Sequence, residues 1–225
     1  MQVALRGDSQ KTFEQRCMQI TRRNPYFRGI AVLIFAFGSS AAEHSFEPVV
    51  IESGSASFEA GTNVPGIEVK GTSSSLSGRA NVAHGEGGLL LEQVRVSLPV
   101  KSLATGMKLR DEHMRKYIFT TSGGQLPDVE FAADQGICRS ATASGEFNCD
   151  LAGNLTIRGV SHEFHTTLTI KEQSSGAPAT FHATGEALVK LSDYGIQAPT
   201  QFGVSASNEV KLRLSRQDNS ARGAQ

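Results

Sequence analysis

Arg110, Asp111 and His113 fall within four residues of one charged stretch, "KLRDEHMRKYIF", which spans residues 108–119. A carboxylate beside a guanidinium and an imidazole can move a proton or hold a polar head group. The stretch is seven charged or histidine side chains in twelve residues, in a chain that otherwise shows short strands separated by glycines. It is therefore the first candidate for an active site, a nucleic-acid contact or a structural clasp.

A second group, "SHEFH", contains His162 and His165. Zinc proteases place two histidines four residues apart on one face of a helix. Here the histidines are three apart in a predicted strand, so they point to opposite faces and do not share a metal. No GxSxG elbow, P-loop or GxGxxG motif is present. We therefore predict no catalytic residue and no metal site.

The N-terminal residues have the order of a signal peptide. Three arginines precede the apolar run "GIAVLIFAFG", and small residues follow it in "SSAAEHS". This pattern predicts a signal peptide over residues 1–42, with cleavage before Glu43 and a periplasmic or secreted product. Met18 is an alternative start, which would make residues 1–17 an upstream extension. The run is shorter than the roughly 20 residues that a stable membrane span requires.

Removal of residues 1–42 changes the net charge. The whole chain has 22 basic and 22 acidic residues, and residues 43–225 keep 16 basic and 20 acidic ones. Nucleic-acid binding needs a basic surface that displaces counterions from phosphates. The acidic balance therefore predicts no nucleic-acid partner.

Two cysteines, Cys138 and Cys149, remain in the expected exported chain, within "CRSATASGEFNC". An oxidising compartment favours a disulfide across this predicted hairpin. Cys149 is in phase with Leu151, but Cys138 is out of phase with Phe131, so the disulfide needs a bulge or a poorly aligned pairing. Two free thiols or a redox pair remain the alternatives.

Period-two alternation dominates residues 43–216, as in "VRVSLPV" and "FHTTLTIK", and turn residues separate the segments. About eight half-exposed antiparallel strands result, so the fold class is all-β. Closure into a barrel removes exposed strand edges. Only residues 107–118 show helical spacing, which predicts one short helix between strands. Residues 217–225 are polar and small and are expected to form a flexible tail.

Four motifs in order resemble the YceI family of periplasmic proteins: "SLPVKSLATGMKLRDEHMRKYIF", "LPDVEFAA", "GNLTIRGVSHEFHTTLTI" and "LSDYGI". The similarity extends over about residues 88–215. It implies an eight-stranded antiparallel lipocalin-like β-barrel that holds a polyisoprenoid or related lipid. It also implies binding, transport or storage without enzymatic activity, and no cofactor apart from a bound isoprenoid lipid. The segment before residue 88 departs from the family pattern, with serines where a histidine usually stands.

The expected inner positions are mostly small, and the chain contains no tryptophan, which favours a ligand over a filled core. The candidate ligand-binding residues are Phe58, Val69, Val94, Val96, Leu98, His113, Met114, Ile118, Phe131, Leu155, Ile157, Phe164, Leu168, Phe181 and Phe202. The expected ligand is an isoprenoid lipid or quinone. Simple core packing is the alternative for many of these positions, and a homodimer is left open.

Within the charged stretch, helical spacing relates Met107, Met114 and Ile118, and also Leu109, His113 and Tyr117, which predicts an apolar stripe turned toward the barrel. Met114 and Ile118 are expected to face the cavity. His113 would then hydrogen-bond a quinone or phenol head group, or else belong to a clasp. Arg110 and Asp111 are expected to fix the helix to the barrel. Two rival functions remain: a stress-response or interaction module with an incidental cavity, and a small enzyme acting on an isoprenoid head group.

Overall fold

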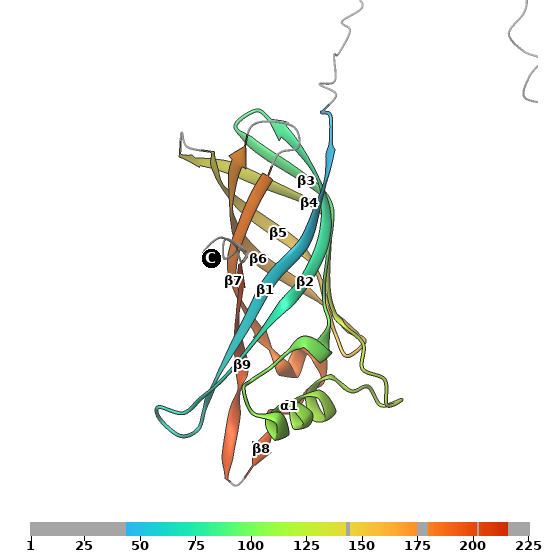
Figure 1. The fold of residues 1–225 in the computed structure, drawn as a ribbon, viewed down its shortest axis with the longest axis vertical. Helices are drawn as coiled ribbons and strands as arrows, with labels where there is room; N and C mark the ends of the chain where they lie inside the picture. Colours follow the sequence, from blue (N-terminus) through green and yellow to red (C-terminus); the bar gives the residue numbers. More distant parts are fainter. Residues whose placement is uncertain (1–43, 143–144, 175–179, 202, 216–225) are drawn as a thin grey trace, which may run out of the picture. The chain divides into compact units, whose positions relative to one another are not determined.

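Long antiparallel strands wind around a common interior, with short helical segments at one end (Figure 1). The computed structural model describes residues 44–142, 145–174, 180–201 and 203–215, all within one compact unit, Ala42–Gln225. The expected signal peptide 1–42, the expected tail 217–225 and Phe202 lie outside the described residues.

Eight of the strands form a closed ring in the order β1-β2-β3-β4-β5-β6-β7-β9, and β1 pairs with β9. This confirms the predicted all-β, eight-stranded antiparallel barrel. The strands are β1 (Glu47–Thr62), β2 (Glu68–Gly85), β3 (Gly88–Leu98), β4 (Val129–Thr142), β5 (Glu146–Ile157), β6 (Val160–Ser174), β7 (Thr180–Lys190) and β9 (Val204–Ser215). A two-residue strand, β8 (Thr200–Gln201), pairs only with β9 among the described strands.

The helical segments lie at one end of the ring. They are η1 (Val100–Ser102), α1 (Lys108–Met114) and the π-helical turn η2 (Arg115–Phe119), all between β3 and β4, and η3 (Leu191–Tyr194) after β7. The turn between β1 and β2 and the strand β8 lie at the same end (Figure 1). We call this end, which α1 covers, the helix end.

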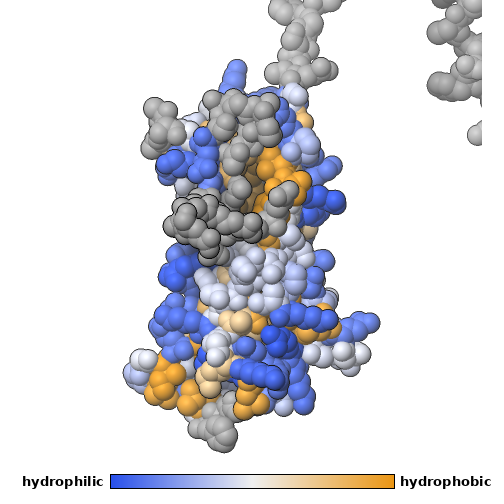
Figure 2. Space-filling model, in the orientation of Figure 1, coloured by the Kyte–Doolittle hydropathy of each residue, from blue (hydrophilic) through white to orange (hydrophobic). Residues whose placement is uncertain are grey.

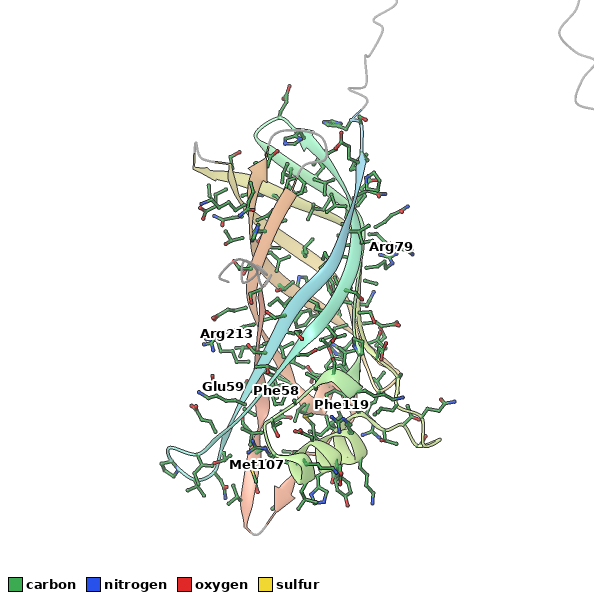
Figure 3. The ribbon with its side chains drawn as sticks, in the orientation of Figure 1. Phe58, Glu59, Arg79, Met107, Phe119 and Arg213 are labelled. Atoms are coloured by element: carbon green, nitrogen blue, oxygen red, sulfur yellow. A yellow bond between two sulfur atoms is a disulfide. The ribbon has the colours of Figure 1, made fainter. Side chains whose placement is uncertain are left out.

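Strand β9 closes the ring, and an ion-pair network on the outer face joins it to both neighbours. Arg213 Nε lies 2.7 Å from Glu186 Oε1 on β7, and its Nη1 lies 3.4 Å from Glu59 Oε2 on β1 (Figure 3). Lys211 also contacts Glu186, at 2.8 Å. Hydrogen bonds from Lys211 and Arg213 hold the pKa of Glu186 below its usual range. Exposed pairs of this kind contribute little individually, so the network mainly favours the correct strand register.

Strand β9 pairs with only part of the length of each neighbouring strand. It pairs with β1 from Ser55 onward and with β7 from Gly185 onward. Among the described residues, no strand pairs with the corresponding edges of residues 47–54 in β1 and 180–184 in β7. The ladder of described strands is therefore closed near the helix end and open between β1 and β7 at the other end.

Two neighbouring strands carry bulges at the same height. The β2–β3 register shifts between Arg79 and Asn81, and the β4–β5 register shifts between Ala132 and Gly136. On β3 the extra residue is Gln93, which adopts a positive φ of 51°. Because a bulge inserts one residue, the inward-facing phase changes there. The β4 bulge is the feature that the cysteine phase had indicated.

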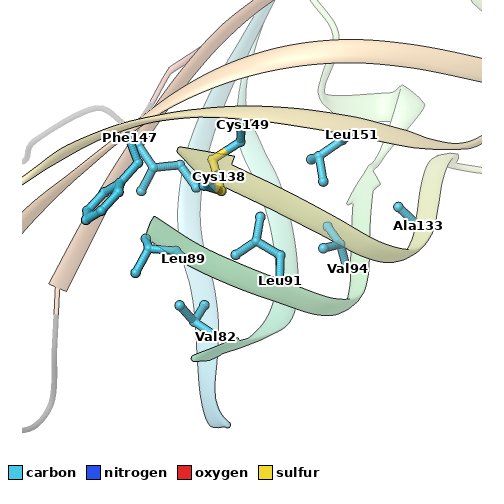
Figure 4. Packing of buried hydrophobic residues seen from close by; sticks show 10 residues of the cluster. Val82, Leu89, Leu91, Val94, Ala133, Cys138, Phe147, Cys149 and Leu151 are labelled. Carbon is cyan, nitrogen blue, oxygen red and sulfur yellow. A yellow bond between two sulfur atoms is a disulfide. The ribbon is translucent and has the colours of Figure 1, made fainter. Parts of the chain in front are cut away.

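The predicted Cys138–Cys149 disulfide is present, and the two cysteines are directly opposite one another on β4 and β5. Both cysteines are 1% exposed and belong to the core cluster away from the helix end (Figure 4). This first cluster consists of Val82, Leu89, Leu91, Val94, Ala133, Cys138, Phe147, Cys149, Leu151 and Ile170. The disulfide therefore joins the strands inside the apolar core.

A second core cluster fills the barrel near the helix end. It consists of Leu155, Ile157, Val189, Leu191, Tyr194 and Ile196. Ile118 and Phe119 of η2 pack against it. Burial raises the pKa of Tyr194 to about 12, and the neighbouring charge of Asp193 adds to the shift. The π-helical turn thus contributes apolar side chains to the closure of this end.

Candidate functional site

Phe131 connects the two core clusters along the inner wall. Its side chain packs against both clusters, and its ring meets that of Phe164 edge-on at 6.0 Å between centroids. On β6, Phe164 and Leu168 alternate with exposed His165 and Thr167, so the first two face the interior. Phe131, Phe164 and Leu168 are only half-buried. Inward-facing apolar side chains that retain solvent-accessible surface indicate an interior that side chains do not fill completely.

The sequence-predicted ligand residues divide into three groups by burial. Four are buried, either in the barrel wall or in the helical segment at its end: Val94, Met114, Leu155 and Ile157. The half-buried members are Phe58, Val69, Val96, Leu98, His113, Ile118, Phe131, Phe164, Leu168 and Phe181. Phe202 lies outside the described residues. Contact between these positions and a ligand remains a prediction.

Two positions of that set meet at the first hairpin. Phe58 on β1 is directly opposite Gly71 on β2, and its ring lies over that glycine. A Cβ at Gly71 would come within 2.3 Å of the ring, so the absence of a side chain permits this placement. Val69 faces Ala60 on the same pair of strands. Small residues opposite larger ones thus shape this side of the interior.

The candidate ligand-binding residues leave out several apolar residues that form the two clusters. They are Leu89, Leu91, Phe147, Leu151, Ile170, Val189, Leu191, Tyr194 and Ile196. Alternation in "EFNCDL" and "FHTTLTI" does place Phe147, Leu151 and Ile170 on the apolar face of their strands. No periodicity marks Tyr194 and Ile196, because Tyr194 ends a 3-10 turn and Ile196 follows it.

Arg110 and Asp111 form a clasp on Thr105 in the turn before α1, whereas they were expected to fix the helix to the barrel. Asp111 is buried, and its Oδ1 accepts hydrogen bonds from the Thr105 backbone N–H at 2.8 Å and from Thr105 Oγ1. Arg110 Nε donates to Thr105 Oγ1 at 2.8 Å, and its Nη2 donates to the Thr105 carbonyl at 2.6 Å. Both side chains therefore hold the turn that enters α1. No strand carboxylate takes part among the described residues.

Arg115 attaches the helical segment to the loop after β3. Its Nη2 donates to the carbonyl oxygens of Leu103 at 3.1 Å and Lys101 at 3.3 Å. That loop in turn pairs with β2, because the backbones of Ala104 and Thr72 exchange two hydrogen bonds at 2.9 Å. A continuous set of contacts thus connects α1 to the barrel wall through backbone groups.

The expectation that Leu109, His113 and Tyr117 turn toward the barrel is wrong. Leu109 is 60% exposed and Tyr117 is 58% exposed, and the His113 ring packs edge-on against Tyr117 at 5.7 Å. The side that faces the barrel carries buried Met114 and half-buried Ile118, two of the positions that were expected there. The helix turns this way because Asp111 and Arg115 bind on the barrel side. His113 is half-buried, and its contact with a ligand stays a prediction.

Replacing Asp111 with asparagine is expected to lower the melting temperature at pH 7 by several degrees. Hydrogen bonds from Thr105 hold the pKa of the Asp111 carboxyl below its usual range. A lowered folded-state pKa gives stability that is present above about pH 4 and is lost as pH falls through that lowered pKa. The deficit of D111N relative to the parent should therefore shrink in acid, as measured by thermal melts between pH 7 and pH 2.

The neighbouring exposed carboxylate provides a matched control for this test. Glu112 is exposed, so E112Q should melt like the parent throughout the same pH range. Parallel curves for D111N and the parent would contradict the role of the Asp111 carboxylate in the clasp.

A surface pocket on the outer wall coincides with the two bulges. Arg95 Nη1 donates to the carbonyl oxygens of Val94 and Ala133, both at 2.9 Å, and Nη2 lies 3.0 Å from Asp134 Oδ1. The guanidinium thus satisfies backbone groups that the bulges expose. Within the described ranges, no group of three His, Cys, Asp or Glu side chains is placed to hold a metal ion. The two bulges and the Arg95 contacts therefore explain the pocket.

The model of the YceI-like domain family matches residues 49–217 of this sequence. The chain belongs to the YceI-like family. That match covers the four motifs and also the divergent first strands, so it extends beyond the resemblance seen in the sequence. No curated protein matches the sequence.

Solved structures share the fold of this YceI-like chain at low sequence identity. A polyisoprenoid-binding domain from Saccharophagus degradans superposes with a TM-score of 0.53 and 16% identity, covering 76% of this chain and 97% of that one. BcnA from Burkholderia cenocepacia gives 0.52 and 16%, covering 72% and 94%. The YceI protein of Campylobacter jejuni gives 0.51 and 18%, covering 68% and 85%. These similarities establish the fold of the YceI-like chain.

Proposed function

We propose that this YceI-like barrel binds one long apolar chain, such as a polyisoprenoid or an isoprenoid quinone, in its interior. The observation that carries the proposal is the set of inward-facing, half-buried apolar side chains between the two core clusters, centred on Phe131. An eight-stranded barrel is wide enough for side chains or for one slender ligand. Binding, not catalysis, is the role that such a wall supports.

The energetics favour an apolar chain without any polar recognition group. Each methylene transferred from water contributes about 0.8 kcal/mol. A ten-carbon stretch therefore gains about 8 kcal/mol before the costs of association and ordering are subtracted. Phe131, Phe164 and Leu168 offer such a chain a continuous apolar contact. The Saccharophagus degradans domain, described as polyisoprenoid-binding, supports the isoprenoid class.

Export to the periplasm or medium is part of the proposal. The Cys138–Cys149 disulfide supports it, because structural disulfides persist in oxidising compartments. The signal-peptide pattern of residues 1–42 supports it as well. No helix in the part of the chain that the structure describes is long and apolar enough to cross a bilayer. A carrier or store of lipid outside the cytoplasm is the function that these features support together.

Mass spectrometry of protein purified from its native compartment tests the ligand class. Native spectra should show one added mass per chain, and an organic extract should contain a prenyl lipid or quinone at about one molecule per protein. The lipid-free chain should take up ubiquinone in a titration. An empty native protein that also fails to take up ubiquinone would contradict the proposal.

A further inference from the structure

The outward face of the helical segment carries large apolar side chains. Met107 is 57% exposed, Leu109 60% and Tyr117 58%. Ile67, in the turn between β1 and β2, is 47% exposed and belongs to the same end of the barrel (Figure 1). Met107 lies at this extremity beside α1 (Figure 3). Isolated apolar side chains are common on surfaces, but several at one end mark an interaction site.

The same segment is basic within an acidic chain. Residues 99–127 contain five basic and two acidic residues, whereas the rest of residues 43–225 contains eleven basic and eighteen acidic ones. Lys101, Lys108 and Lys116 are exposed, as is the acidic Glu112. The Asp111 carboxylate is buried against Thr105 and does not face solvent. The exposed charge of the segment is therefore positive.

Apolar and basic groups are interleaved on this surface. Lys108 lies between Met107 and Leu109 in the chain, and Lys116 Nζ lies 5.3 Å from the centre of the Tyr117 ring. Figure 2 shows hydrophobic and hydrophilic surfaces side by side at the helix end. This arrangement matches that of interfacial segments, which place apolar side chains among the acyl chains and lysines among the head groups. Tyrosine is favoured at that depth.

We infer that the helix end docks on the surface of an anionic phospholipid bilayer through Met107, Leu109 and Tyr117, with Lys108 and Lys116 contacting lipid head groups. Charge complementarity identifies the partner: each lysine near an anionic surface strengthens binding about fivefold. A second copy of this chain is disfavoured, because a two-fold dimer through this face would bring two basic segments together. The docking surface is distinct from the proposed interior site and does not depend on the identity of its ligand.

The geometry makes such docking compatible with a folded barrel. Met107, Leu109 and Tyr117 face away from the core, and the clasp and the Arg115 contacts hold α1 on its other side. Insertion of these three side chains into the interface therefore requires no unfolding. Docking would orient the barrel end-on, with the helix end against the bilayer.

Vesicle flotation with the full chain tests the inference. The probes are vesicles of phosphatidylcholine alone and of phosphatidylcholine with phosphatidylglycerol in a ratio of about two to one. The parent should float with the anionic vesicles, less with the neutral ones, and less again as salt is raised. K108Q/K116Q should bind anionic vesicles about 30-fold more weakly. L109E/Y117E should lose flotation almost completely.

A matched variant controls for the loss of exposed apolar surface and for the added charge. V50E/I137E replaces two side chains that are 66% and 57% exposed on strands β1 and β4, away from the helix end, and should float like the parent. Failure of the parent to bind, or equal loss in V50E/I137E, would overturn the inference. Binding of these residues to a protein in place of vesicles would overturn it as well. Lipid extraction from the same samples separates the two proposals: a bound prenyl lipid without flotation contradicts docking alone, and flotation without a bound lipid contradicts the carrier role alone.

Discussion

Replacing Cys138 and Cys149 together with alanine is expected to lower the free energy of unfolding by about 3 kcal/mol. The disulfide closes a loop with a sequence separation of 11, and the loop-entropy relation gives about that value for so short a ring. Domains of ordinary size have about 5–15 kcal/mol in total, so the loss is a large fraction of the stability. Urea unfolding monitored by circular dichroism measures it through the change in midpoint.

An exposed pair on the adjacent rung of the same hairpin provides the matched control. Arg139 is directly opposite Asn148, and both side chains face solvent. R139A/N148A removes an exposed contact of Arg139 with Asp150 and should cost less than about 1 kcal/mol. Equal losses of unfolding free energy in the two double variants would show that disturbing the hairpin, and not removing the disulfide, causes the loss. Reductant should lower the midpoint of the parent, and a parent that reductant leaves unchanged would be equally inconsistent with a structural disulfide.

The strands were predictable because, along each strand, the apolar or polar character of a side chain indicates whether it faces inward or outward. In β6, Phe164, Leu168 and Ile170 share one face, with polar Thr166 as the exception, and the structure keeps that phase. In β4 the phase of Cys138 disagreed with that of Phe131, which indicated either a bulge or a poorly aligned pair, and the structure has the bulge. A break in the alternation of inward-facing residues is therefore informative when a disulfide is expected at the same place.

The bulge on β3 could not be predicted in the same way. The segment "LLLEQVRV" is apolar at three consecutive positions, so it fits either inward phase. The structure resolves it by placing Gln93 at positive φ, a conformation that a non-glycine residue rarely adopts. The Arg95 guanidinium donates to the carbonyl oxygens of Val94, beside the bulge, and of Ala133 on the neighbouring strand, and a local sequence pattern does not reveal this contact between strands.

The orientation of α1 shows why counting apolar residues can select the wrong face of a helix. Leu109 and Tyr117 form a plausible inward stripe at a spacing of eight residues, yet both are exposed. The buried side includes Asp111, whose charge is stabilised by Thr105 from outside the helix. Periodicity places Met114 and Ile118 inward, but it assigns a carboxylate to solvent, so it could not identify Asp111 as buried on that side.

Replacing Ala187 with phenylalanine is expected to weaken binding of the isoprenoid ligand about a hundredfold. Ala187 is half-buried on β7, directly opposite Leu212 of β9, and alternates with exposed Glu186 and Leu188, so it faces the interior. An added ring would displace about four methylenes of a ligand, at about 0.8 kcal/mol each. The resulting loss of about 3 kcal/mol corresponds to that change in Kd. Titration of the lipid-free variant with ubiquinone measures it.

The adjacent position on the same strand separates occupied space from general disturbance. Leu188 is 64% exposed, so L188F adds a ring on the outer face and should bind ubiquinone with unchanged affinity. If Ala187 instead faced a tightly packed core, the new ring would lower stability by about 1–3 kcal/mol through overpacking while leaving any ligand elsewhere in place. A lower melting temperature with unchanged affinity for ubiquinone would therefore contradict a ligand beside Ala187. Weaker binding at an unchanged melting temperature would place the ligand beside Ala187, because a ring that fits without strain can displace only what the interior already holds.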